Sequence, residues 1–222
     1  QAQTMGYTVV DTSTVVATHL STLLQAHAHE LLGHEEVQQL LNLLARQAPK
    51  LVEDLVPKTL PLSVVVRVLQ DLLAEGVAIR DMRTIAETLA EHAPRSQDPV
   101  VLTAAIRASL GRSIIQNING IEKDLQVITL NPELEQLLLQ SLQSGNDGGI
   151  GMEPGLAQRI HERLSETVQQ LDLAGKPAVL VVSPQLRPSL ARWVRPSIKA
   201  LHVLGFNEIP DNKQVSVIAS VG

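Results

Sequence analysis

The sequence contains no cysteine, and its only aromatic residues apart from histidine are Tyr7, Trp193 and Phe206. Without cysteine the chain has no disulfide, no thiolate zinc site and no cysteine nucleophile. The scarcity of aromatic rings removes platforms for base stacking, and a net charge of −5 opposes contact with a phosphate backbone. The composition therefore predicts no nucleic-acid partner and a core of leucine, valine, isoleucine and alanine.

The sequence also lacks a long apolar run. No stretch reaches the roughly 18 uncharged apolar residues that a membrane-spanning helix requires. The N-terminus has neither an initiator methionine nor the charged-then-apolar layout of a signal peptide. We interpret the abrupt start, QAQTMGYTVVD, as an indication that the chain is part of a longer protein.

Apolar residues at helical spacing dominate the sequence from about residue 14 to residue 118. Proline and glycine divide this region into successive helices, at Gly33, Pro49, Pro57 and Gly76. The β-branched segment at 7–10 precedes it and predicts a strand. The sequence therefore predicts the remnant of a strand followed by an all-helical subdomain.

Strand signals return after residue 120. Apolar, β-branched segments predict strands at 125–130, 177–182, 200–206 and 215–221. A helix capped by Asn131, with Pro132 as its first residue, and a long amphipathic helix from residue 153 separate the first two of them. This order predicts a small α/β subdomain in which helices cover a mixed sheet. The predicted fold class is therefore α/β, with several subdomains.

The segment HAHELLGHEE, residues 27–36, resembles a zinc-protease helix but lacks its spacing. A zincin helix carries two histidines at i and i+4, on the same face. His29 and His34 are at i and i+5, which at about 100° per residue places them roughly 140° apart. We therefore predict solvated histidines beside a helix end at Gly33, and no metal or cofactor.

Two other segments suggest catalytic motifs without their defining residues. The glycine-rich residues 144–151 follow a helix and contain no lysine, so they are predicted to be a linker and not a phosphate-binding loop. Ser183 follows a strand, but the segment lacks G-x-S-x-G, and Pro184 removes a backbone N–H that an oxyanion hole would use. We predict that Ser183 is a turn or N-cap residue and that the chain is not an enzyme.

Arg80, Asp81 and Arg83 lie at the start of a predicted helix. Arginine at this end of a helix opposes the helix dipole. Such arginines therefore need carboxylate or carbonyl partners, either within the chain or across a subunit contact.

Several segments together resemble the export-gate family of bacterial type III secretion. They run in one order along the chain: GYTVVD and ATHL within 6–20, IRDMRTIAETLAEHAP at 79–94, SLGRSI at 109–114, LEQLLLQSLQ at 134–143 and EPGLA at 153–157. The resemblance is closer to the flagellar branch than to the virulence systems, and it covers essentially the whole chain.

This resemblance implies a non-enzymatic platform that docks and sorts chaperone–substrate complexes for flagellar protein export. It implies the cytoplasmic part of a bacterial inner-membrane protein, joined to the membrane only through an N-terminal half outside this chain. A homo-oligomeric ring and contacts with other export-apparatus proteins are also expected.

The resemblance further divides the chain into the end of a first cytoplasmic subdomain (1–31), a helical subdomain (32–111) and a mixed α/β subdomain (112–222). It places Thr18 at a hydrophobic dimple that docks flagellar chaperones. From the residues alone, Thr18 is equally well interpreted as a mid-helix residue bonded to its own backbone. Arg80, Asp81 and Arg83 fall in the subdomain that contacts ring neighbours, so they are a candidate subunit contact.

An alternative function is a regulatory DNA-binding protein. The helices on either side of Gly76 have the shape of a helix-turn-helix, and the α/β subdomain would then bind a ligand. The second helix would enter the major groove, but it is acidic overall, with Asp81, Glu87 and Glu91 against Arg83. The charge balance therefore favours the export-gate hypothesis.

Overall fold

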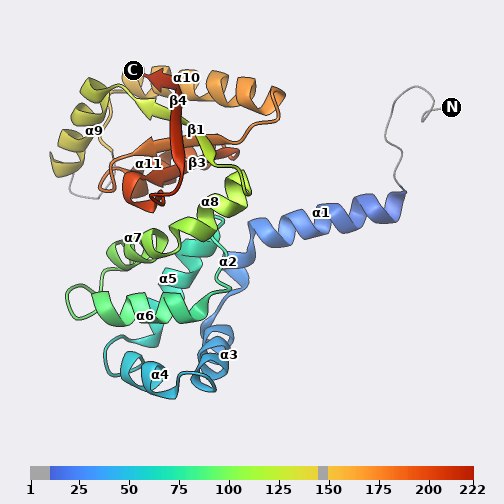
Figure 1. The fold of residues 1–222 in the computed structure, drawn as a ribbon, viewed down its shortest axis with the longest axis vertical. Coiled ribbons are helices and arrows are strands. Elements are labelled where there is room, and N and C mark those ends of the chain that lie inside the picture. Colours follow the sequence, from blue (N-terminus) through green and yellow to red (C-terminus); the bar gives the residue numbers. More distant parts are fainter. Residues whose placement is uncertain (1–10, 145–149) are drawn as a thin grey trace. The chain divides into compact units, whose positions relative to one another are not determined.

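The computed structural model describes residues 11–144 and 150–222 (Figure 1). Contacts between residues divide the chain into two compact units, with the boundary between Thr103 and Ala104. The first unit is helical where it is described and the second is α/β, which confirms the predicted class. The predicted strand at 7–10 and most of the loop at 144–151 lie outside the described residues. The finer division at residues 31 and 111 remains a prediction.

Helices follow one another through the first unit, with short connections at the predicted breaks. Gly33 precedes α3, Pro49 opens α4 and Gly76 follows α5. The helices are α1 (Thr12–Ala26), α2 (Ala28–Leu31), α3 (His34–Ala45), α4 (Pro49–Leu55), α5 (Leu62–Ala74), α6 (Met82–His92) and the first part of α7 (Pro99–Ser109). None of the helices in the described ranges is long and apolar enough to cross a membrane.

The core of the first unit is aliphatic and centres on α5. This helix packs against α2 and α3, while α4 packs against α3 and α6. The side-chain amide of Gln70 also donates to the carbonyl of Leu32 at 2.8 Å. The buried side chains include Val37, Leu41, Leu44, Val65, Val68, Leu69, Leu72, Ile85 and Leu89. Each such side chain stabilises the fold by about 1.5–3 kcal/mol when buried. Aliphatic side chains are therefore sufficient to stabilise this core without aromatic residues.

Gly76 ends α5 with a backbone conformation that favours glycine, at φ +73°. Its N–H donates to the carbonyl of Leu73, and the N–H of Val77 donates to that of Leu72, both at 2.9 Å. These bonds satisfy carbonyls at the helix end that would otherwise have no partner. The predicted break between two helices is therefore confirmed at this glycine.

The second unit is built on a four-stranded sheet. Its strands are β1 (Asp124–Leu130), β2 (Ala178–Val182), β3 (Leu201–Gly205) and β4 (Gln214–Val221), in the order β3-β2-β1-β4. All three neighbouring pairs are parallel. The expected mixed sheet is therefore wrong in its strand directions, although the α/β class is right.

The error comes from the connection between β3 and β4. Parallel strands usually need a crossover of about a dozen residues or more, and residues 206–213 are short for that purpose. Nevertheless β3 and β4 lie at opposite edges of the sheet, so the segment crosses from one edge to the other. It begins with the 3-10 helix η2 (Phe206–Glu208), whose last residue is buried.

Helices α9 (Pro132–Ser144), α10 (Pro154–Leu173) and α11 (Arg187–Val194) share one apolar core with the sheet. Alternate residues of β2, namely Ala178, Leu180 and Val182, belong to this core. Val179 and Val181 point to the other face and are also buried. Because β2 is buried on both faces, its sequence AVLVV is an uninterrupted apolar run.

Glu208 is held by two buried arginines. Arg107 of α7 donates from Nε to Oε1 at 3.0 Å and from Nη2 to Oε2 at 2.6 Å. Arg187 of α11 places its Nε 3.6 Å from the same Oε1. The three side chains are each 3% exposed. Because a two-pronged guanidinium–carboxylate contact has a fixed geometry, it holds the crossing segment at one place in the unit.

Helix α8 (Gly111–Asn119) begins beside the same segment. A Cβ on Gly111 would lie 2.1 Å from the carbonyl oxygen of Glu208, closer than any side chain can approach. Glycine is therefore required here by the close approach of two backbones. Helices α7 and α8 are separate elements, divided at Leu110.

We expect Glu208→Gln to destabilise the second unit by about 3 kcal/mol, because it leaves two buried guanidinium groups without their carboxylate. Urea denaturation followed by Trp193 fluorescence measures this, since that tryptophan lies on α11. The control is Glu166→Gln, which alters an exposed pair with Arg163 at 3.9 Å and should cost less than about 1 kcal/mol. Equal losses for the two variants would show that the buried cluster contributes no special stability.

Gly111→Ala should cost about 1–3 kcal/mol, because the added methyl forces the backbone of Glu208 to move. Gly155→Ala is the matched control, since a Cβ at Gly155 meets nothing within 4 Å. That substitution lies within α10 and should stabilise the protein by about 0.5–1 kcal/mol. Opposite signs of the two changes in denaturation midpoint are expected. A neutral Gly111→Ala would contradict the close approach.

Candidate functional site

Helix α1 carries Thr18, the residue predicted to contact a partner. Asp11 caps this helix, because its carboxylate accepts from the backbone N–H of Thr14 at 2.7 Å and from its hydroxyl at 3.1 Å. These bonds, the backbone one first, lower the pKa of the Asp11 carboxyl. No residue of α1 is buried. The helix is therefore locally well specified but has no packed face of its own.

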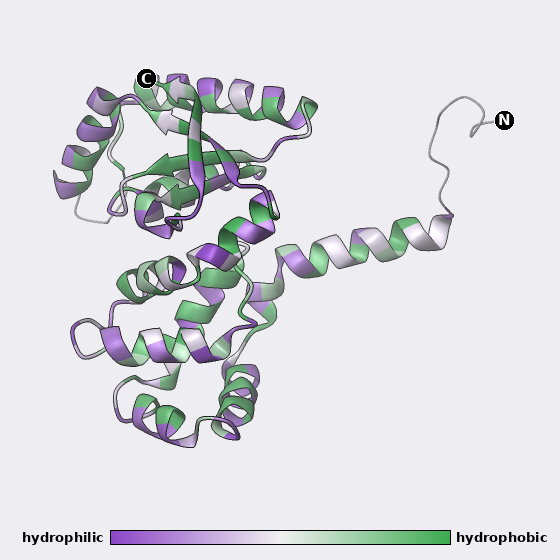
Figure 2. Ribbon diagram, viewed as in Figure 1, coloured by the Kyte–Doolittle hydropathy of each residue, from purple (hydrophilic) through white to green (hydrophobic). Residues whose placement is uncertain are grey.

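The two sides of α1 differ in chemistry, as the hydropathy colours in Figure 2 indicate. Its apolar stripe spans about 100° of the helix surface and is 44–61% exposed, and its members are Val16, Leu20, Leu23 and Leu24. Thr18 lies roughly opposite, on a face of small side chains with Thr14, Ser21, Thr22 and the exposed Val15. A protein surface that covers the stripe would therefore leave Thr18 accessible.

The bond from a side-chain hydroxyl to the helix backbone that was considered for Thr18 is instead made by Thr22. The hydroxyl of Thr22 donates to the carbonyl of Thr18 at 2.9 Å. Within the described residues, the Thr18 hydroxyl has no hydrogen-bond partner of its own. Its side chain is therefore free to contact another molecule.

Arg80, Asp81 and Arg83 lie at the start of α6, on a different element from Thr18. The Asp81 carboxylate caps α6 by accepting from the Thr84 hydroxyl at 2.7 Å and from its backbone N–H at 3.0 Å, and these bonds lower the pKa of Asp81. Arg83 Nε donates to Glu87 Oε1 at 2.9 Å, one turn further along. Arg80 is exposed and has no ion-pair partner among the described residues.

The histidine segment forms a small polar contact where α1 gives way to α2. His27 Nδ1 lies 2.7 Å from Glu30 Oε1, and the rings of His27 and His29 stack with centroids 6.5 Å apart. The contact with His27 lowers the pKa of Glu30. No group of three or more metal-ligating side chains gathers in the described part of the chain.

Ser183 occupies the turn that leads from β2 into α11. Its carbonyl accepts from the N–H groups of Leu186 and Arg187 at 3.1 and 3.0 Å, which confirms the predicted turn role. Its own N–H donates to Glu135 Oε1 at 2.6 Å. These bonds give Ser183 a structural function at the start of α11.

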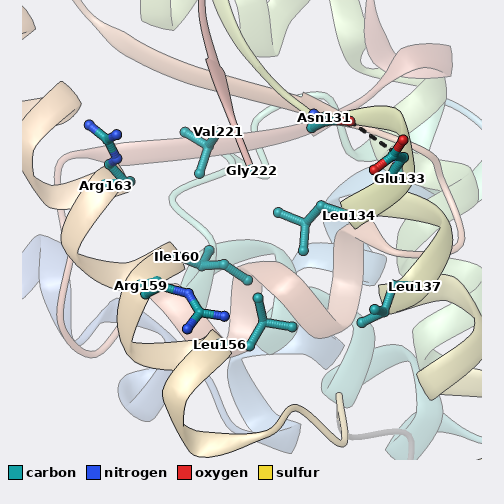
Figure 3. A pocket seen from close by; sticks show the side chains of 10 residues that line it. All are labelled: Asn131, Glu133, Leu134, Leu137, Leu156, Arg159, Ile160, Arg163, Val221 and Gly222. Carbon is teal, nitrogen blue, oxygen red and sulfur yellow. Dashed lines mark hydrogen bonds between the residues drawn. The ribbon is translucent and has the colours of Figure 1, made fainter.

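A cavity of about 460 Å³ lies in the second unit and was not predicted from the sequence (Figure 3). Its lining comes from α9, α10 and the end of β4, with apolar side chains from both helices pointing toward one another. The available signal was the pair Arg159 and Arg163, one helical turn apart on the exposed side of a predicted amphipathic helix.

Comparison with known proteins identifies the family. The FHIPEP family model matches residues 1–214. The flagellar biosynthesis protein FlhA of Escherichia coli (strain K12) is 50% identical over 222 residues, which is all of this chain and 32% of that protein. The chain therefore spans about a third of the length of this relative.

Solved structures of other proteins share this fold. The CdsV protein of Chlamydia pneumoniae matches with a TM-score of 0.86 and 24% identity, over 94% of this chain and 60% of that one. The nonameric SctV-C of EPEC, a cryo-EM structure, matches with a TM-score of 0.77 and 27% identity, over 93% and 62% of the two chains.

The fold, the order of the segments and the matched family agree with the resemblance that the sequence showed. The matched family consists of export-gate proteins and not of enzymes, as predicted. The chain corresponds to the C-terminal cytoplasmic region of these proteins. It belongs to the FHIPEP family, the family of the flagellar biosynthesis protein FlhA.

Proposed function

We propose that this chain is part of a cytoplasmic docking and sorting platform of the flagellar type III export gate, where it binds chaperone–substrate complexes. The observation that carries the proposal is the 50% identity to FlhA over the whole chain. The protein acts at the inner face of the bacterial inner membrane, and its partners are flagellar export chaperones with their cargo and other export-apparatus proteins.

Thr18 on α1 is the proposed chaperone contact. The apolar stripe of Val16, Leu20, Leu23 and Leu24 suits packing against a protein surface, because exposed apolar side chains at helical spacing favour burial. Packing on that side supports a role for the opposite face, where Thr18 lies among small side chains. A surface of small side chains is shallow, so a partner can approach the helix closely.

The same assembly is proposed to be a ring. SctV-C of EPEC is nonameric, which supports the proposal that the present chain also forms a homo-oligomer. Arg80, Asp81 and Arg83 are the proposed subunit contact. Since Asp81 and Arg83 already have partners within α6, Arg80 is the member of the group best able to reach a neighbouring subunit.

The DNA-binding alternative receives no support from the fold. On α6, Arg83 is paired with Glu87, and Glu91 is also exposed, so the helix presents acidic groups to solvent. A phosphate backbone would be repelled by such a surface.

Thr18→Met in the complete cytoplasmic region should weaken binding of flagellar chaperone–cargo complexes at least tenfold. The bulkier side chain fills the shallow face, and methionine has the higher helix propensity, so α1 itself should not be destabilised. A pull-down with purified complexes, followed by titration, measures the loss.

His19→Met is the control, because it places the same side chain about 100° around the helix. It should bind like the wild type. If Thr18→Met binds equally well, Thr18 is not the contact. If the wild type binds no chaperone complex, the docking function itself is wrong.

Arg80→Glu should weaken self-association of the complete cytoplasmic region severalfold, because it places a negative charge where a cation is proposed to meet a neighbour. Sedimentation velocity over a concentration series measures this. Arg95→Glu makes the same charge change at another exposed arginine of the first unit and should leave association unchanged. An identical response of the two variants would assign residues 80–83 to intrachain contacts alone.

A further inference from the structure

The cavity between α9 and α10 has an apolar floor and a charged rim. Leu134 and Ile160 are 8% and 2% exposed, whereas Leu137 at the margin is 48% exposed. Figure 3 shows the side chains of the two helices pointing into the same space. The full lining is Asn131, Glu133, Leu134, Leu137, Leu156, Arg159, Ile160, Arg163, Val221 and Gly222.

The cavity lies where the order of the sheet reverses. The chain runs from β1 through β2 to β3 in one direction and then places β4 on the other side of β1. The carboxyl ends of β1 and β4 meet at one edge, where Leu130 is opposite Val221. In open parallel sheets, binding sites form outside the carboxyl ends of strands at such a reversal.

Charges on the two sides of the cavity have opposite sign. Arg159 and Arg163 project from α10, and Figure 3 places Glu133 on the far side, at the start of α9. Arg159 has no ion-pair partner within the described residues. Arg163 has only an exposed neighbour, Glu166, at 3.9 Å. In a chain of net charge −5, this is a local cationic flank beside apolar side chains.

We propose that this cavity is a docking groove for an acidic amphipathic helix of a partner protein. Leucine-like side chains of that helix would occupy the floor between α9 and α10. Its carboxylates would pair with Arg159 and Arg163, while Glu133 disfavours acidic residues on the other side and so sets the direction of the helix. The groove is independent of docking at Thr18, which lies in the other unit.

A peptide fits the groove better than a small molecule does. Small-molecule sites bury most of their ligand and fix it with a few polar groups deep in the pocket. Here the charged groups, Glu133, Arg159 and Arg163, are all exposed, while the deep positions are apolar. An apolar floor with a charged rim is the arrangement that receives one face of an amphipathic helix.

The test is fluorescence polarisation with the full chain and two labelled peptides. Both peptides carry leucines at i, i+4 and i+7; one has glutamates on the flank and the other has lysines there. The wild type should bind the glutamate peptide about tenfold more tightly than the lysine peptide, since two exposed charge pairs together change affinity by roughly this factor. Arg159→Glu with Arg163→Glu should reverse the preference.

Two matched controls separate the groove from general effects. Arg192→Glu with Arg195→Glu makes the same charge change at the C-terminal end of α11 and should leave the preference intact. Leu137→Glu should abolish binding of both peptides, whereas Leu173→Glu, at a position 83% exposed and outside the cavity lining, should not. Trp193 fluorescence and circular dichroism verify that each variant is folded.

The proposal is wrong if neither peptide binds the wild type, or if the two bind equally. It is also wrong if the α11 variant loses the preference as fully as the α10 variant. If peptide binding is absent while Arg159→Glu with Arg163→Glu changes the sedimentation of the chain, the groove is instead a contact between copies.

Discussion

In the second unit, the path of the chain depends on the carboxylate of Glu208. The segment after β3 has to cross from one edge of a parallel sheet to the other with few residues, and its short 3-10 helix offers little hydrogen bonding of its own. Arg107 and Arg187 come from α7 and α11 and meet on this one carboxylate. A buried charge requires such partners, and here the same contacts hold the beginning of the segment that leads to the last strand.

The parts of the fold that depend on neighbouring residues were predictable from the sequence, whereas those that depend on contacts between distant residues were not. Helix limits such as those at Gly33, Gly76 and Asp81 follow from capping and backbone conformation within a few residues, and these were found in the sequence. The uninterrupted apolar run of β2 likewise predicted a strand. The direction of β4 follows from a segment that crosses the sheet and is held by a contact between residues 107 and 208, and no local pattern encodes a contact at that separation.

The two candidate sites also differ in whether the sequence could identify them. Thr18 was identified by resemblance alone, and the structure adds that it faces away from the apolar stripe of α1. The groove of the second unit was missed, because its two arginines look in sequence like the solvated side of an amphipathic helix. Only the meeting of α9, α10 and β4 at one edge of the sheet gives those arginines an apolar surface to border.

The contact between Gly111 and Glu208 also limits how this sequence can vary. Clashes between two side chains are commonly relieved by a compensating change at the partner position. At Gly111 the opposing atom is a backbone carbonyl oxygen, so no replacement of residue 208 can make room for a side chain at 111. Position 111 should therefore evolve without covariation, remaining glycine while residues around it drift, and its constancy would report backbone geometry and not partner recognition.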